Sequence, residues 1–249
     1  MTTSLLSLLG RGALAGGAAG LVSGGFSYLF AEPVLDRAVH LEAAREEASG
    51  TTAAAEVFSR STQHAGLFVA ALVTGAAIGV LFALVYAILH RRDPDGAPWK
   101  RSLMLAGAGF TGLWLLPFLR YPANPPGVGD PGTIDARSSA WLAAVGIGLV
   151  AVVLAWRLHA WMVQREYAVP LRQLTVLAVL VAALASQFAL PDNPDPVTAP
   201  ATLVWDFRLL SVASTGLLWA GLAAAFGLLG VRATRAGRSE VPVSAVPAA

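Results

Sequence analysis

Cysteine is absent from this chain of 249 residues, and charged residues are scarce at 13%. Without cysteine there can be no disulfide framework, no thiolate metal site and no cysteine nucleophile. A soluble domain carries about 25% charged residues, so the low charge excludes an ordinary soluble domain. The chain has instead 56% hydrophobic residues in long uninterrupted blocks, as a bilayer requires. The sequence therefore predicts a polytopic membrane protein.

The signatures of several activities are missing as well. The sequence has no P-loop, no HExxH metal motif and no GxSxG nucleophile motif. It has no run of basic and aromatic residues suited to nucleic acid. The apolar blocks are almost free of ionisable groups, so no isolated acid pair forms a proton relay. We therefore expect neither an enzyme, nor a nucleic-acid partner, nor a self-contained ion pump.

Six apolar blocks are each close to the roughly 20 residues that cross a bilayer. The predicted spans are residues 10–30, 64–89, 101–119, 139–161, 170–190 and 208–231. We expect an all-α fold in which these spans form three helical hairpins in one membrane domain over residues 1–231. The small, polar and proline-bearing residues 232–249 predict a disordered tail.

The distribution of charge predicts the orientation. One alternate set of loops and ends holds eleven Lys and Arg residues against four acids, and the other set holds six against eleven. The positive-inside rule places the first set, with both termini, in the cytoplasm. Residues 31–63, 120–138 and 191–207 then face outward from a bacterial cytoplasmic membrane. A signal peptide is disfavoured for the first span, because Arg11 follows its first apolar residues rather than preceding them.

A stripe of glycines marks one face of the first span. Its members recur every fourth residue, and the second span offers a matching pair. They are Gly12, Gly16, Gly20 and Gly24 in the first span, with Gly75 and Gly79 in the second. Small residues at this spacing let two helices approach closely in lipid, so we expect the stripe to be a helix-packing surface.

Two of the outward loops are rich in proline and resemble each other. The stretch PANPPGVGDP (122–131) and the stretch PDNPDPVTAP (191–200) are identical at five of ten positions. Both follow an odd-numbered span, and a D-x-R sequence precedes the next span in each. We interpret them as parts of duplicated helical hairpins, and internal repeats are typical of transporter folds. We expect the two proline segments to pack together over the end of the bundle, with Arg137 and Arg208 beneath them.

Three arginines lie near the outward ends of the even-numbered spans, namely Arg60, Arg137 and Arg208. This position opposes the positive-inside bias and puts a cation at the positive end of a helix dipole. They are either snorkelling side chains with incidental ion pairs or part of a polar vestibule that marks a pathway. The candidate pathway residues beside them are Gln63, Asn124, Asn193 and Asp206. An Asn within a proline turn can also serve only the backbone of that turn.

The first outward loop carries candidate metal ligands. The stretch EPVLDRAVHLEAAREEASG predicts a helix that ends at Gly50, and Glu32, Asp36 and His40 would share one face of it. Two carboxylates and an imidazole suit a divalent transition-metal ion, with His64 at the mouth of the second span as a fourth candidate. The same residues also describe a solvated acidic face, and both readings remain open.

Four stretches in order along the chain resemble the CbtA family of cobalt transporter subunits. They are FAEPVLDRAVHLE (30–42), RSTQHAGL (60–67), GFTGLWLLPFLRYPANPPGVGDPGTIDARS (109–138) and LVWDFRLLSVAS (203–214). The third is the most distinctive, and Arg120 stands where the family pattern has a lysine, which keeps the charge. The resemblance covers essentially the whole chain.

The resemblance implies a membrane subunit for the uptake of Co²⁺, or of Ni²⁺, linked to cobalamin synthesis and without a tightly bound cofactor. It also implies a partner similar to CbtB, a small single-span protein with a histidine-rich segment. Such a partner would supply the imidazoles that this chain lacks. The alternative is a structural or assembly membrane protein that docks a partner through its rigid outward loops and transports nothing.

Overall fold

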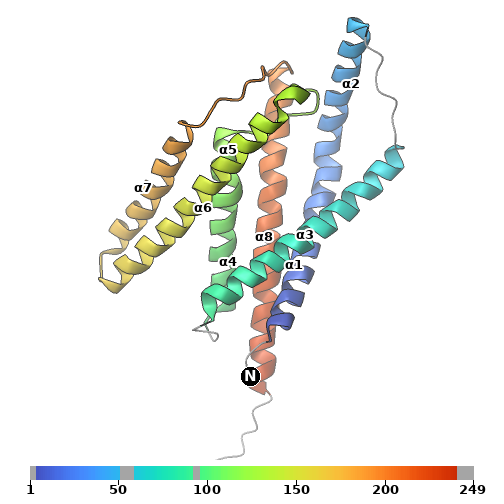
Figure 1. The fold of residues 1–249 in the computed structure, drawn as a ribbon. Coiled ribbons are helices and arrows are strands. Elements are labelled where there is room, and N and C mark those ends of the chain that lie inside the picture. Colours follow the sequence, from blue (N-terminus) through green and yellow to red (C-terminus); the bar gives the residue numbers. More distant parts are fainter. Residues whose placement is uncertain (1–3, 51–58, 92–95, 240–249) are drawn as a thin grey trace, which may run out of the picture. The chain divides into compact units, whose positions relative to one another are not determined.

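The regular elements of the chain are helices throughout residues 4–50, 59–91 and 96–239, the part that the computed structural model describes (Figure 1). The elements are α1 (Leu5–Phe26), α2 (Glu32–Ser49), α3 (Arg60–His90), α4 (Pro98–Gly109), α5 (Leu116–Arg120), α6 (Ile134–Gln164), α7 (Val169–Gln187) and α8 (Ala201–Ser239). Two π-helical segments, Ser27–Ala31 and Phe110–Leu115, join α1 to α2 and α4 to α5.

Six helical stretches are long and apolar enough to cross a membrane, as the sequence predicts. They are Leu5–Arg45, Ser61–His90, Pro98–Arg120, Pro131–Gln164, Val169–Gln187 and Ala201–Arg235. The predicted spans lie within these stretches, except that the fifth helix ends at Gln187 rather than at residue 190. The chain is therefore an all-helical, multi-pass membrane protein.

The last helix differs most from its predicted bounds. α8 begins at Ala201, directly after Pro200, because residues 201–239 contain no proline that would interrupt a helix. It continues to Ser239, so the predicted disordered tail is wrong for residues 232–239. The remaining predicted tail, residues 240–249, lies outside the described residues.

The two π-helical segments each precede a proline inside a continuing helix. A proline ring collides with the carbonyl four residues earlier in an α-helix. That carbonyl belongs to Leu29 for Pro33 and to Leu113 for Pro117, and both leucines lie within a π-helical segment. The wider π-helical turn offsets this carbonyl from the ring. As a result α2 extends α1 instead of starting a separate helix, while Gly50, at φ 72°, ends α2 as predicted.

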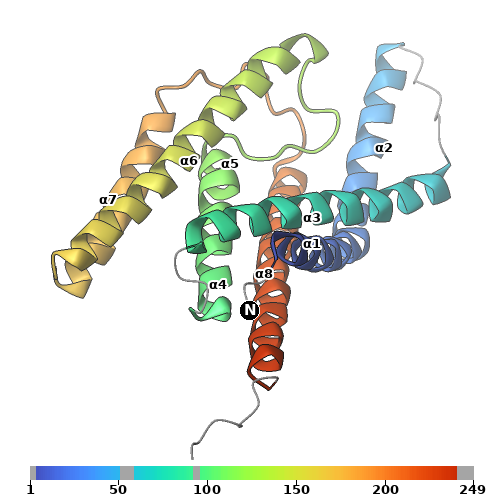
Figure 2. The ribbon, with the colours of Figure 1, turned by 60° about the horizontal axis from the view of Figure 1, so that its bottom comes forward.

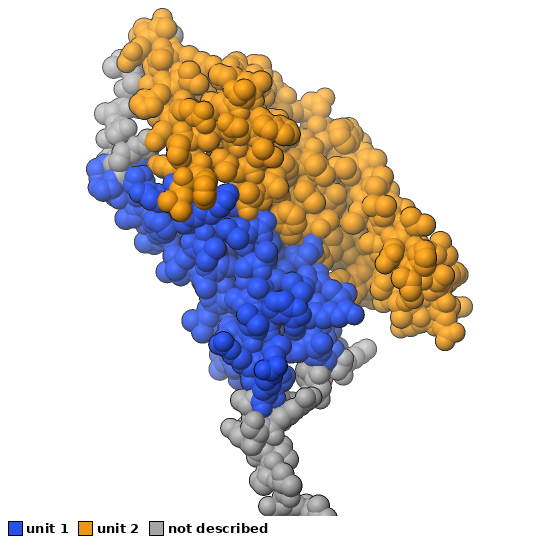
Figure 3. Space-filling view, turned by 180° about the vertical axis from the view of Figure 1, so that it is seen from behind, with its two compact units in different colours: residues 1–28, 58–107, 214–249 blue, residues 29–57, 108–213 orange. Residues whose placement is uncertain are grey.

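The chain forms two compact units, where the sequence predicts one domain over residues 1–231 (Figure 3). Unit 1 comprises described residues within 1–28, 58–107 and 214–249, and unit 2 those within 29–57 and 108–213. Three helical stretches pass from one unit to the other.

Unit 1 is built on the crossing of α1 and α3 (Figures 1 and 2). A Cβ added at Gly12 or Gly16 would collide with the carbonyl oxygen of Gly79 or Gly75, so only glycine allows this approach. Gly20 lies in the same way against the carbonyl oxygen of Ala71 in α3, and a Cβ at Gly24 would meet the Ala71 Cβ at 2.8 Å. The stripe is thus a backbone-to-backbone contact between the first two spans.

The apolar core of unit 1 lies beside this crossing. Phe226 of α8 is 1% exposed, and its ring meets Phe82 and Tyr86 of α3 edge-on at centroid distances of 5.2 and 5.1 Å. Leu222 of α8 and Ala106 of α4 belong to the same cluster. Edge-to-face aromatic pairs of this kind add to the stabilisation from burial.

Unit 2 includes residues 108–120 of the third span and the whole of the fourth and fifth spans. Gly112 and Gly148 bring the third span against α6, since a Cβ on either glycine would collide with the backbone of the other helix. α7 packs along α6 (Figures 1 and 2). Leu116, Ala151 and Ala183 form an apolar cluster that α5, α6 and α7 share. The fifth span therefore has its main packing partner in the span that precedes it.

Candidate functional site

Two proline-rich segments of unit 2 lie against each other, and we name them elbow 1 (residues 121–131) and elbow 2 (residues 188–200). Arg120, at the end of α5, donates from Nε to the carbonyl of Gln187 at 3.0 Å. Its Nη2 donates to the carbonyls of Leu190 and Pro191 at 2.9 and 3.1 Å and to Asp192 Oδ1 at 2.7 Å. The last carbonyls of a helix lack an intrahelical donor, and this one guanidinium satisfies several acceptors around the end of α7.

The aromatic residue next to Arg120 strengthens the same junction. The hydroxyl of Tyr121 donates to the Pro191 carbonyl at 2.6 Å. The Arg120 guanidinium lies over the rings of Tyr121 and Phe188, at 4.7 and 5.3 Å from their centroids. The Arg120 side chain is 8% exposed, so these cation–π contacts form away from water, where they are strongest.

A charged pair joins the first turn of α6 to elbow 2. Arg137 Nε lies 3.1 Å from Asp195 Oδ2, and the Asp195 side chain is only 5% exposed. The carboxylate also accepts from Thr133 Oγ1 at 2.8 Å, and the Asp195 N–H donates to Asn193 Oδ1 at 3.2 Å. Arg137 Nη2 donates in addition to the Asp130 carbonyl. A carboxylate with this degree of burial needs such partners to remain charged.

Arg208, the second arginine of the repeated D-x-R sequence, binds elbow 1. Arg208, in α8, donates from Nε to the Ala123 carbonyl at 3.2 Å and from Nη2 to Asn124 Oδ1 at 2.9 Å. Thus Arg137 follows elbow 1 and binds elbow 2, whereas Arg208 follows elbow 2 and binds elbow 1. This reciprocal exchange is what two equivalent hairpins facing each other would produce, and it supports the duplication.

The helix α2 packs beside elbow 2 and the start of α8. Val34 and Ala38 are buried against Leu203. Arg45 donates to the Thr198 carbonyl at 2.8 Å, and a Cβ on Gly127 of elbow 1 would meet the Glu42 side chain at 3.0 Å. We call the two elbows, with the helix turns that bind them, the elbow cap.

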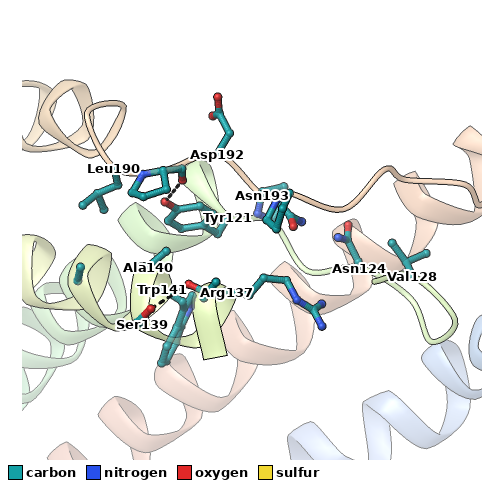
Figure 4. A pocket seen from close by; sticks show the side chains of 15 residues that line it. Tyr121, Asn124, Val128, Arg137, Ser139, Ala140, Trp141, Leu190, Asp192 and Asn193 are labelled. Carbon is teal, nitrogen blue, oxygen red and sulfur yellow. Dashed lines mark hydrogen bonds between the residues drawn. The ribbon is translucent and has the colours of Figure 1, made fainter. Parts of the chain in front are cut away.

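An open pocket of about 640 Å³ lies between elbow 1, elbow 2 and the first turns of α6 in the elbow cap (Figure 4). Its polar residues include Asn124, Asn193 and Arg137, three of the residues predicted for a pathway. Trp141 contributes an indole ring from α6, and the prolines of both elbows contribute apolar surface. The pocket therefore combines a few polar groups with apolar walls, as small-molecule sites do.

The other predicted pathway residues lie outside this pocket. Asp206 lies 3.5 Å from Arg37 in an exposed pair on α8 and α2. Gln63 lies in the first turn of α3, in unit 1. Arg60 begins α3, and its side chain lies outside the described part of the structure.

The predicted metal ligands do not form a closed site. Glu32, Asp36 and His40 are spaced four residues apart on α2, and His40 is exposed. His64 belongs to unit 1, where its ring meets Tyr28 edge-on at 4.9 Å. Among the described residues, no three His, Cys, Asp or Glu side chains come together in a way that could hold a metal ion. Metal ligation by these four residues stays a prediction.

The residues that sequence reasoning missed are those that hold the elbows together. Arg120 is visible in the sequence only as a charge at the end of a span, and Tyr121 and Thr133 as ordinary loop residues. The available signal is positional, since Arg120 directly precedes a segment whose prolines cannot donate hydrogen bonds. Such a segment needs donors from outside its own backbone.

Gln187, at the end of α7, is a fully buried amide, and its Oε1 has no hydrogen-bond partner within the described residues. Its Nε2 donates to the Ala144 carbonyl at a long 3.3 Å. Because the unpaired oxygen is already an energetic cost, we expect Gln187→Leu to change the free energy of unfolding by no more than about 1 kcal/mol, or to raise it. Thermal unfolding of the purified protein measures this change. A loss above about 2 kcal/mol would show that Oε1 has a partner.

Six long apolar helices and a pocket of small-molecule size between the two elbows define a multi-pass membrane protein with a candidate substrate site. The family model described as "Probable cobalt transporter subunit (CbtA)" matches residues 5–230. The chain belongs to this family, which is one of transporter subunits rather than enzymes. No curated protein and no solved structure matches the chain.

Proposed function

We propose that this chain is the membrane subunit of a cobalt uptake transporter and that the elbow cap is its outward-facing end. The observation that carries the proposal is the match to the cobalt transporter subunit family over residues 5–230. The pocket under the elbow cap supports the proposal, because it is a place where the transported substrate can first bind. Transport runs inward from this pocket, and the cargo is Co²⁺, or Ni²⁺ as the closest alternative.

The proposed orientation rests on charge. The connections between α3 and α4 and between α6 and α7 with their adjoining helix ends, together with the regions near both termini, carry eleven of the 17 Lys and Arg residues, whereas residues 31–63, 120–138 and 191–207 carry eleven of the 15 acids. Both termini therefore lie in the cytoplasm of the bacterial cell, and the acidic α2 lies outside. There Glu32, Asp36, His40 and His64 raise the local concentration of divalent cations.

The proposed transporter also needs a partner. The described residues hold no group of three metal-ligand side chains, and the chain has four histidines and no cysteine. We propose that a small single-span protein with a histidine-rich segment, similar to CbtB, supplies the missing imidazole ligands. The imported cobalt then supplies cobalamin synthesis.

The orientation can be tested with single cysteines, since the native chain has none. Val197→Cys, at a 45% exposed position in elbow 2, should react with a membrane-impermeant maleimide added to intact cells. Gln164→Cys, at the end of α6, should react only after the cells are opened. Labelling in the reverse pattern would place the elbow cap in the cytoplasm and contradict inward transport from it.

Transport itself is tested with radiolabelled cobalt in cells under cobalt limitation. We expect deletion of the gene for this chain to remove the saturable part of cobalt accumulation, and the wild-type chain with its small partner to restore it. The chain without the partner should restore less. Unchanged accumulation after deletion would favour the alternative function, a structural protein that uses the elbow cap to dock a partner.

A further inference from the structure

The polar groups of the pocket under the elbow cap are mainly donors, because its amide oxygens are already occupied. Asn124 Oδ1 accepts from Arg208 at 2.9 Å, and Asn193 Oδ1 accepts from the Asp195 N–H at 3.2 Å. Both partners can only donate, so the oxygen of each amide must be the atom that faces them. The NH₂ group of each amide is then the end left over, and neither has a hydrogen-bond partner among the described residues.

Other acceptors of the pocket hold hydrogen bonds as well. Asp192 Oδ1 accepts from Arg120 at 2.7 Å, while the Asp192 side chain as a whole is 92% exposed. The Pro191 carbonyl accepts from both Tyr121 and Arg120. The lining contains no histidine, and its guanidinium, on Arg137, lies 3.1 Å from the Asp195 carboxylate. A bare divalent cation would find few free ligands there.

The size and surface of the pocket also disfavour a bare ion. Its volume of about 640 Å³ is many times the roughly 30 Å³ that one water molecule occupies in the liquid. Figure 4 shows the amides of Asn124 and Asn193 on one side of the pocket and the Trp141 ring on α6. Leu190, Val128 and the elbow prolines add apolar surface to the lining. This volume lies in the range of small organic ligands.

We infer that this pocket binds a small organic anion with several carboxylates, through the two amide NH₂ groups and Arg137. Charged oxygens are the acceptors that such donors bind most strongly. If the proposed transport function holds, on which this step rests, the anion is the chelator of the cobalt ion. The transported substrate is then a metal carboxylate chelate, and the chelator provides the ligands that the chain does not.

The test uses the full-length chain in lipid nanodiscs, with calorimetric titration of citrate, of equimolar cobalt–citrate and of Co²⁺ alone. We expect citrate and cobalt–citrate to bind with one stoichiometric site and Co²⁺ alone to bind more weakly. Asn124→Asp keeps an oxygen toward Arg208 but replaces the NH₂ donor with a carboxylate oxygen. It should weaken citrate binding by about tenfold or more. Gln173→Glu, the same change at an exposed position of α7, should leave binding unchanged.

Two outcomes would overturn the inference. One is that the wild type binds neither citrate nor cobalt–citrate, and the other is that Asn124→Asp binds both as the wild type does. Thermal unfolding shows whether the variant is folded, and Ala140→Trp, which fills the pocket from α6, gives an independent loss of binding. Cobalt uptake that does not change with added citrate would refute the chelate while sustaining transport. Citrate binding without any cobalt uptake would refute transport while sustaining the anion pocket.

Discussion

Gly16→Ala should lower the free energy of unfolding by about 3 kcal/mol, the upper end of what overpacking costs. The added methyl group would collide with the Gly75 carbonyl and stand 2.8 Å from Gly79 Cα. Both obstacles are backbone atoms, which cannot turn aside as a flexible side chain can. The two helices must therefore separate or shift along each other. Chemical or thermal unfolding in detergent measures the loss.

The matched control is Gly10→Ala, in the same helix. A Cβ at Gly10 has no atom within 4 Å, so the substitution brings only the gain of alanine over glycine inside a helix, about 0.5–1 kcal/mol. Opposite signs for the two substitutions would establish the close contact of α1 and α3. Equal effects would mean that the glycine stripe of α1 is not a packing contact with α3.

Arg137→Met should also cost about 3 kcal/mol, because it leaves the Asp195 carboxylate, 5% exposed, without its cation. Thr133 alone would remain as a side-chain donor to it. Adding Asp195→Asn should recover part of the loss, since the neutral amide costs less to bury than an unpaired charge. Thermal unfolding of the two single variants and the double variant gives the coupling between the residues.

An exposed ion pair of unit 2 serves as the control. Arg37 and Asp206 lie 3.5 Å apart, with side chains 61% and 44% exposed. Pairs of this kind contribute about 0–1 kcal/mol, so Arg37→Met should have little effect. If Arg37→Met and Arg137→Met cost the same, then the pair of Arg137 with Asp195 does not lock elbow 2 in place.

The six spans could be predicted because hydrocarbon thickness imposes a length and a composition that one sequence displays directly. The glycine contacts of α1 and α3 could be predicted for a similar reason. A four-residue spacing puts Gly12, Gly16 and Gly20 on one helix face, whichever helix packs against it. That the helix continues through Pro33 could not be predicted from the sequence. It depends on a local π-helical turn at residues 27–31, and no residue pattern predicts such a turn.

The candidate site, too, could be predicted only in part. The repeated proline segments, with Arg137 and Arg208 after them, are visible in the sequence, and the structure brings these residues together at the elbow cap. Which atoms of Asn124 and Asn193 remain free is not visible, because it follows from partners 84 residues away in one case and two residues away in the other. The sequence therefore indicates polar residues near a pathway, while their donor character requires the three-dimensional structure.

The central claim is that this family member imports cobalt through the pocket under the elbow cap. The most direct test is uptake of radiolabelled cobalt by deletion cells that carry the wild-type chain, Ala140→Trp or Leu142→Trp. Ala140 lines the pocket, whereas Leu142, two residues along α6, is 60% exposed and does not line it. The account predicts loss of saturable uptake for Ala140→Trp and wild-type uptake for Leu142→Trp at equal protein levels. Wild-type uptake by a folded Ala140→Trp variant would contradict it.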